Sequence, residues 1–97
     1  MAFAPLKEGS NEAKSGKGKA TAKTSSQTLW AENANRVQLI VQNRGSSDVW
    51  VAFGKTAAVE EGFFVAKEGG QISIDNYSGP VSVITPSGES ALTYVEI

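Results

Sequence analysis

Few residues in this sequence have the types and spacing needed for chemistry. There is no cysteine and no histidine, so one chain cannot build thiolate metal sites, the usual zinc sites, or Ser-His and Cys-His nucleophile pairs. Glu60 and Glu61 form the only adjacent acidic pair. Neighbours on an extended chain point to opposite sides, whereas glycosidase acids face each other across about 5 to 9 Å. We therefore expect solvated loop charges, no catalytic or metal site, no bound cofactor, and a protein that is not an enzyme.

A second chemical candidate is the Gly-Lys stretch SGKGKATAKT, residues 15–24. A phosphate-binding loop needs a wider spacing that ends in Gly-Lys-Ser/Thr, after a strand and before a helix. This stretch has neither the spacing nor the flanking elements, so we do not interpret it as a nucleotide site.

The positive charge lies at the N-terminal end. Met1 to Ser25 carries five lysines and two glutamates, whereas Ser26 to Ile97 carries four basic and eight acidic residues. Residues 15–26 contain no Leu, Ile, Val, Phe, Tyr or Trp, so they cannot bury enough apolar area to offset the entropy of ordering the backbone. The sequence predicts an extended basic arm over residues 1–25 that is disordered alone and binds something negative. The alternative is a terminus without a role.

The elements that must position any site are short strands. Beyond residue 26, apolar and polar residues alternate in stretches separated by Gly, Asn, Ser and Pro, and this period of two is typical of half-buried strands. The spacing predicts one all-β domain over residues 26–97, a small antiparallel β-sandwich, jelly-roll-like, of about seven strands. The expected strands lie at 27–30, 36–43, 48–54, 63–66, 71–75, 80–85 and 92–97.

Two of these stretches suggest an interface. We expect 36–43 and 48–54 to form a hairpin, because the turn cluster NRGSSD separates them. If Leu39 and Val51 share one face of this hairpin, Ile40 and Trp50 meet on the other. Apolar patches on small domains tend to mark interfaces, so these two residues are candidates for a contact between subunits. The alternatives are that both faces are covered, or that the two strands lie in different sheets.

Two binding functions remain open. Lys-rich arms bind phosphate backbones and small β-barrels bind single strands, but the acidic body and the lack of aromatic residues among the lysines make nucleic acid an improbable partner. A carbohydrate-binding sandwich would stack sugars on Trp30, Trp50 or Tyr77, although such residues are more often in the core. No apolar run approaches the roughly 20 residues of a membrane span, so we expect no membrane contact and synthesis in the cytoplasm.

The order of several motifs resembles small β domains of tailed-bacteriophage particles. These motifs are ANRVQLIVQNRGSSDVWVAFG at 34–54, GG at 69–70, GPVSVI at 79–84 and GESALTYVEI at the end. The domains they resemble are head decoration (cement) proteins or head-fibre modules, and the match covers roughly residues 28–97.

The resemblance implies a structural virion protein, often a homotrimer, that binds the major capsid protein on the capsid exterior and stabilises the shell. The N-terminal arm would then lie across capsid subunits, and Ile40 and Trp50 would lie between copies. The alternative position in the virion is a head-fibre, neck or tail attachment module. The expected shell-contacting residues are Phe3, Leu6, Lys14, Lys17, Lys19 and Lys23.

Overall fold

The computed structural model describes residues 16–97, and over that range the chain forms eight strands and no helix. The all-β prediction is confirmed, and each of the seven expected strands is present. The strands are β1 (Gly16–Ala22), β2 (Gln27–Trp30), β3 (Gln38–Asn43), β4 (Val49–Phe53), β5 (Phe63–Val65), β6 (Gln71–Asp75), β7 (Val81–Ile84) and β8 (Ser90–Glu96).

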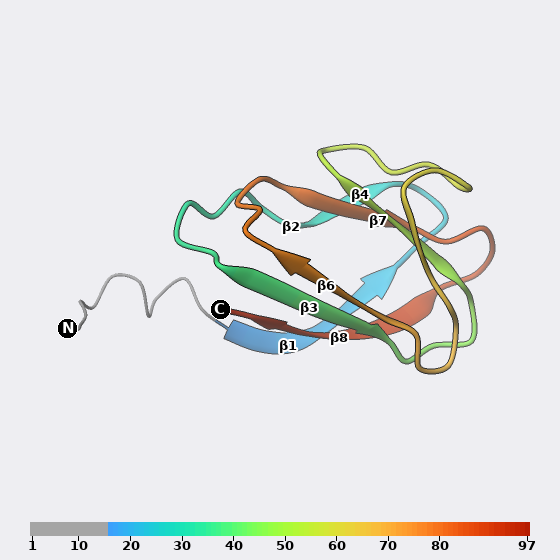
Figure 1. Cartoon of the computed structure of the whole chain (residues 1–97). Helices are drawn as coiled ribbons and strands as arrows, with labels where there is room; N and C mark the ends of the chain where they lie inside the picture. Colours follow the sequence, from blue (N-terminus) through green and yellow to red (C-terminus); the bar gives the residue numbers. More distant parts are fainter. Residues whose placement is uncertain (1–15) are drawn as a thin grey trace.

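The strands form two four-stranded antiparallel sheets that face each other as a sandwich (Figure 1). One sheet has the order β1-β8-β3-β6 and the other β2-β7-β4-β5. We call them the first and the second sheet. The pairs β1–β8, β2–β7, β3–β6 and β4–β5 are those of one long antiparallel hairpin rolled into two layers. This arrangement is the eight-stranded jelly roll.

The rolled hairpin corrects one expectation. β3 lies in the first sheet and β4 in the second, so the turn cluster between them crosses from one layer to the other and closes no hairpin. Among the described strands, only β4 and β5 are consecutive in the chain and neighbours in a sheet. The alternation of side chains sets which face of a strand is buried, but it does not set which strand lies beside it.

The core lies between the two sheets and follows the period of two. Leu39 and Val41 of β3 are fully buried, as are Val49 and Val51 of β4. They pack with residues from the other strands, which are Ala22, Trp30, Val65, Ile74, Val81, Val83 and Leu92. These four residues face inward as expected, whereas Val37 and Phe53, which the alternation places on the same side, are 60% and 45% exposed at the strand ends.

The predicted arm over residues 1–25 is wrong for residues 16–22. These residues form β1, which pairs with β8 along seven positions, from Gly16 opposite Glu96 to Ala22 opposite Ser90. At the inward position Gly18, an added Cβ would lie 3.3 Å from the Tyr94 hydroxyl, so a side chain there would require this ring to shift. The β domain therefore includes Gly16–Ala22, and Phe3, Leu6 and Lys14 lie outside the described residues.

Candidate interaction surfaces

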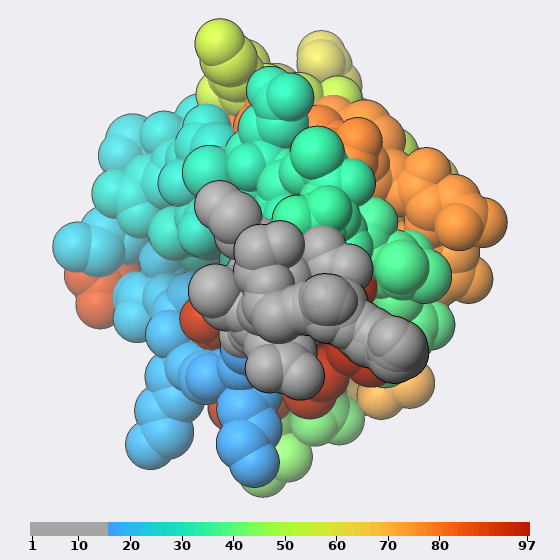
Figure 2. All heavy atoms as spheres, turned by 90° about the vertical axis from the view of Figure 1, so that its left-hand side faces the viewer, coloured from blue at the N-terminus to red at the C-terminus, as the bar shows by residue number. Residues whose placement is uncertain are grey.

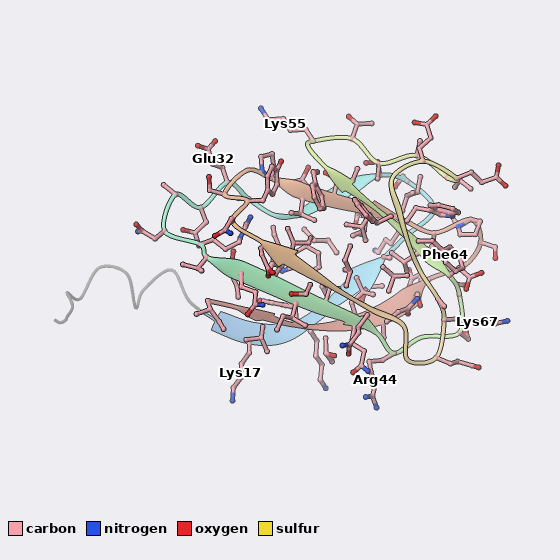
Figure 3. The ribbon with its side chains drawn as sticks, in the orientation of Figure 1. Lys17, Glu32, Arg44, Lys55, Phe64 and Lys67 are labelled. Carbon is pink, nitrogen blue, oxygen red and sulfur yellow. The ribbon has the colours of Figure 1, made fainter. Side chains whose placement is uncertain are left out.

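Lys17 and Lys19 lie on the outer face of the first sheet. Both are exposed, and in the register of β1 with β8 they stand opposite Val95 and Thr93. Figure 3 shows Lys17 projecting away from this sheet. Two of the predicted arm lysines are thus fixed on a strand, about two residues apart along its axis, with side chains that point to solvent.

Lys23 follows β1 and has a different environment. Its ammonium lies 3.9 Å from the Glu89 carboxylate, and both side chains are at least half exposed. Such a surface pair contributes about 1 kcal/mol or less. The backbone has the firmer role here, because the Lys23 carbonyl accepts the Thr85 N–H at 2.9 Å.

Next to the lysines, the outer face of the first sheet carries polar and aliphatic residues. Ile40 of β3 stands between Val95 of β8 and Ser73 of β6. An open depression of about 170 Å³ lies here, smaller than the roughly 300 to 1,000 Å³ of small-molecule sites. It is lined by Ile40, Gln42, Gln71, Thr93, Tyr94 and Val95.

Ile40 and Trp50 do not meet. Ile40 belongs to the first sheet and Trp50 to the second, and since neither points into the core, they lie on opposite outer faces of the sandwich. Both are half-buried. The expectation of one apolar patch made by these two residues is wrong, because it depended on the hairpin that the jelly roll does not form.

Trp50 instead contacts an aromatic residue of β5. Trp50 stands opposite Phe64 in the register, and the two ring centroids are 5.1 Å apart. Phe63 stacks on Phe53 with centroids 5.2 Å apart, and Phe53 stacks on Tyr77 at 5.0 Å. Phe63 and Phe64 are each 53% exposed. Aromatic rings therefore cover both sides of β5, a surface that we call the β5 aromatic edge: Trp50, Phe53, Phe63, Phe64 and Tyr77.

The sequence itself indicates this edge, through two consecutive phenylalanines. Consecutive residues of a strand point to opposite faces, so the pair Phe63-Phe64 places one ring on each face of any strand that contains it. Only one of these faces can look into the core. An exposed aromatic residue could therefore be predicted at this position.

A buried arginine joins three segments at one end of the sandwich. The Arg36 side chain is fully buried, and its Nε donates to the Glu96 carboxylate at 2.8 Å. One terminal nitrogen donates to the Tyr77 and Gly79 carbonyls, at 3.1 and 2.8 Å, and the other to the Ala31 carbonyl at 2.8 Å. Arg36 thus ties the β2–β3 loop, the β6–β7 loop and the end of β8. Figure 2 looks onto this end, where these segments gather.

Asn43 has the same role at the other end. It is fully buried, and its amide nitrogen donates to the carbonyls of Ser47 and Val65, at 2.8 and 3.1 Å. Its side-chain oxygen accepts the Gly45 N–H at 3.0 Å and the Ser90 hydroxyl at 2.6 Å. Buried polar groups with all their partners fix loops in one arrangement, so Arg36 and Asn43 are structural residues.

The remaining candidate residues lie in the core, against a neighbouring ring or in an exposed loop. Trp30 is buried in the core with Tyr94 at its edge, 5.3 Å between centroids, and is not a sugar platform. Tyr77 packs against Phe53 and donates its hydroxyl to the Pro80 carbonyl at 2.9 Å. Glu60 and Glu61 are exposed in the β4–β5 loop. Within residues 16–97, no group of three or more acidic side chains is placed to hold a metal ion.

Comparison with known proteins identified no relative of this chain. No family model, no curated protein and no solved structure matches this chain. Over residues 16–97 there is also no helix with the length and apolar character to cross a membrane.

Proposed function

We propose that this chain is a structural protein of a bacteriophage particle, which binds the outside of the capsid shell and stabilises it. It has no catalytic role in this proposal, and its partners are the major capsid protein and further copies of itself. The order of sequence motifs over residues 28–97 supports this assignment. Jelly-roll domains occur in viral particles and in lectins, but a fold alone does not determine function.

The observation that carries the proposal is the placement of Lys17 and Lys19. Both project from a rigid edge strand onto one open sheet face, directly after the fifteen residues that contain Phe3, Leu6 and Lys14. In the proposal the two fixed lysines contact carboxylates of the shell, and residues 1–15 extend the contact to neighbouring capsid subunits. Electrostatic complementarity of this kind gives orientation and speeds association.

The test is co-sedimentation with expanded capsid shells that lack this protein, taken from the phage that encodes it. Full-length protein is compared with a variant that begins at Gly16, which keeps β1, and with Lys17→Glu. Lys55→Glu is the matched control, since Lys55 is exposed and lies on the opposite side of the molecule from Lys17 (Figure 3).

We expect full-length protein and Lys55→Glu to sediment with the shells. Lys17→Glu and the truncated form should bind more weakly, with the deficit of Lys17→Glu shrinking at high salt, where surface charges are screened. Failure of full-length protein to bind would contradict the decoration role and favour a head-fibre, neck or tail position. Retention of labelled oligosaccharide or oligonucleotide by the free protein would instead favour a ligand-binding domain.

A further inference from the structure

An open depression lies at the end of the sandwich where β1 begins. It has a volume of about 300 Å³, which is the lower end of the range of small-molecule sites. Residues of β2 and of the β2–β3 loop line it, together with Tyr94 and Glu96 of β8. The start of β1, the end of β8 and the β2–β3 loop lie together at this end of the molecule (Figure 1).

The floor of this depression is apolar. The Trp30 and Tyr94 rings meet edge to face, with 5.3 Å between their centroids. Trp30 is only 4% exposed, whereas Leu29 and Tyr94 are partly buried against the core and keep exposed surface. The surface open to a ligand is therefore mainly that of Leu29 and Tyr94, and an aromatic side chain fits it well because rings pair edge to face or offset.

The acidic group of the depression is already satisfied. The Glu96 carboxylate accepts hydrogen bonds from Arg36 Nε at 2.8 Å and from the Asn33 amide at 3.4 Å. Its charge is thus balanced by a buried guanidinium, so it has little need of a further cation. The depression is better suited to an apolar group than to a metal ion or an amine.

β1 does not fill the space on its own side. Gly16 and Gly18 lie on the face of β1 that looks inward, because side chains alternate along a strand and Ala22, of the same parity, is fully buried. A Cβ added to Gly16 would meet nothing within 4 Å. The space between the sheets beside Gly16 is therefore open to a side chain from elsewhere.

The chain itself carries a fitting group close to this opening. Residues 1–15 lead into Gly16, which stands opposite the lining residue Glu96. The bulky apolar residues of this segment are Met1, Phe3 and Leu6, and nine residues separate Leu6 from Gly16. A random coil of nine residues spans about 15 to 18 Å on average, so this length allows the front of the chain to return to the depression.

The tether also favours the chain's own segment over that of a second copy. A group on a short linker has an effective concentration on the order of millimolar near its attachment point. A second copy reaches such a concentration only in very concentrated protein. Among the three apolar residues, Phe3 is the aromatic one, and it matches the Tyr94 ring.

We propose that Phe3 docks in this depression of its own chain, against Leu29 and Tyr94, with residues 7–15 as the tether. The docking concerns the free protein and does not depend on the capsid role. Within that role, Phe3 has to leave the depression before it contacts the shell, so the shell and the depression compete for the same side chain.

The first experiment compares amide NMR spectra of the full chain and of Phe3→Ser. Removal of the ring should shift the signals of residues 29–33 and 94–96, which lie in and beside the depression. Ala4→Ser is the matched control, because it also introduces a serine beside the same tether, and it should leave these signals in place. Neither change removes a contact within residues 16–97, and the signals of residues 44–47, at the other end of the sandwich, should stay unchanged in both variants.

A spin label then tests whether the ring comes from the same chain. The sequence has no cysteine, so Ala2→Cys accepts a single nitroxide next to Phe3. At about 0.1 mM, below the effective concentration of the tether, the label should broaden the signals of residues 29–33 and 94–96 most strongly, and Phe3→Ser in the labelled chain should remove this preference. Labelled chain mixed with isotope-enriched unlabelled chain should show no broadening.

Three results would overturn the proposal. The first is a spectrum of Phe3→Ser that matches the full chain around the depression. The second is broadening spread evenly over the domain, which would mean that the segment has no preferred site. The third is broadening of equal strength in the mixed sample, which would assign the docked ring to a second copy. Because both measurements use the free protein, none of these results bears on shell binding.

Discussion

Arg36 and Glu96 form a buried ion pair, with 2.8 Å between Nε and the carboxylate oxygen, across sixty residues of sequence. The pair joins the segment that leads into β3 to the last residue of β8, and three further hydrogen bonds from the guanidinium hold two loops beside it. Arginine suits this position because its planar fork of five N–H donors reaches acceptors in several directions. One side chain therefore organises the end of the sandwich at which Gly16 pairs with Glu96.

Replacement of this arginine should destabilise the fold strongly. Arg36→Ala takes the donor from three carbonyls and leaves the Glu96 carboxylate with the Asn33 amide at 3.4 Å. Loss of one partner of a buried pair lowers the free energy of unfolding by about 3 to 5 kcal/mol. Arg36→Lys should recover little of it, since one ammonium cannot reach all four acceptors. Urea unfolding measures the effect. Arg44→Ala is the control, because Arg44 is exposed and its loss should change stability by less than about 0.5 kcal/mol.

Replacement of Asn43 by aspartate, which has the same shape, should also destabilise the fold. Asn43→Asp replaces the amide nitrogen that donates to the Ser47 and Val65 carbonyls with an oxygen that cannot donate. We expect a loss of at least about 2 kcal/mol, since buried acceptors lose their partner and a charge is placed among them. Asn35→Asp, at an exposed position, makes the same chemical change and should leave the urea midpoint unaltered. Equal stability of the two variants would contradict the role of Asn43.

The sequence predicted the seven strands that have large apolar residues at alternate positions, and it failed at β1 for a physical reason. β1 alternates Lys17 and Lys19 with Gly18 and Ala20, so it has the period of a strand without its apolar side chains. It is ordered by seven positions of pairing with β8, and at Gly18 the Tyr94 ring lies where a side chain would be. Neither cause can be read from the local composition.

For the candidate sites, too, the features set by contacts between distant segments could not be predicted from the local sequence. Lys17 and Lys19 are exposed, but on a strand and not on the disordered arm that their composition predicted. The separation of Ile40 from Trp50 depends on sheet order, which the period of two does not contain. The burial of Arg36 depends on the convergence of Ala31, Tyr77, Gly79 and Glu96 around it, so an isolated arginine beside a strand gives no sign of it.

Gly45 should not accept a side chain. A Cβ at this position would overlap the Ser90 hydroxyl and would lie 2.6 Å from the Ala91 backbone nitrogen. Gly45→Ala must therefore displace β8 or the β3–β4 connection, and overpacking of this kind lowers stability by about 1 to 3 kcal/mol. Gly16→Ala is the control, since nothing lies within 4 Å of its added Cβ. Thermal unfolding of the two variants should separate them, and similar midpoints would show that the β8 backbone yields at no energetic cost.

Two truncations should have very different stabilities. A chain that begins at Gly16 keeps every described strand, so we expect its free energy of unfolding to stay within about 1 kcal/mol of that of the full chain. A chain that begins at Ser26 lacks β1. This removes the buried Ala22, leaves one edge of β8 unpaired at seven positions, and takes the Lys23 carbonyl from the Thr85 N–H. Its free energy of unfolding should fall by several kcal/mol, or its unfolding should no longer be cooperative.

Urea unfolding followed by tryptophan fluorescence can measure this difference, because Trp30 is buried near Tyr94 and reports on the inside of the sandwich. Loss of β1 should shift its emission toward that of a solvent-exposed indole even without urea, whereas loss of residues 1–15 should leave the emission in place. A chain from Ser26 as stable as the chain from Gly16 would show that β1 is an accessory of the fold. If the chain from Ser26 is destabilised as expected, only a truncation at Gly16 can separate shell binding by the N-terminal residues from the folding of the domain that carries them.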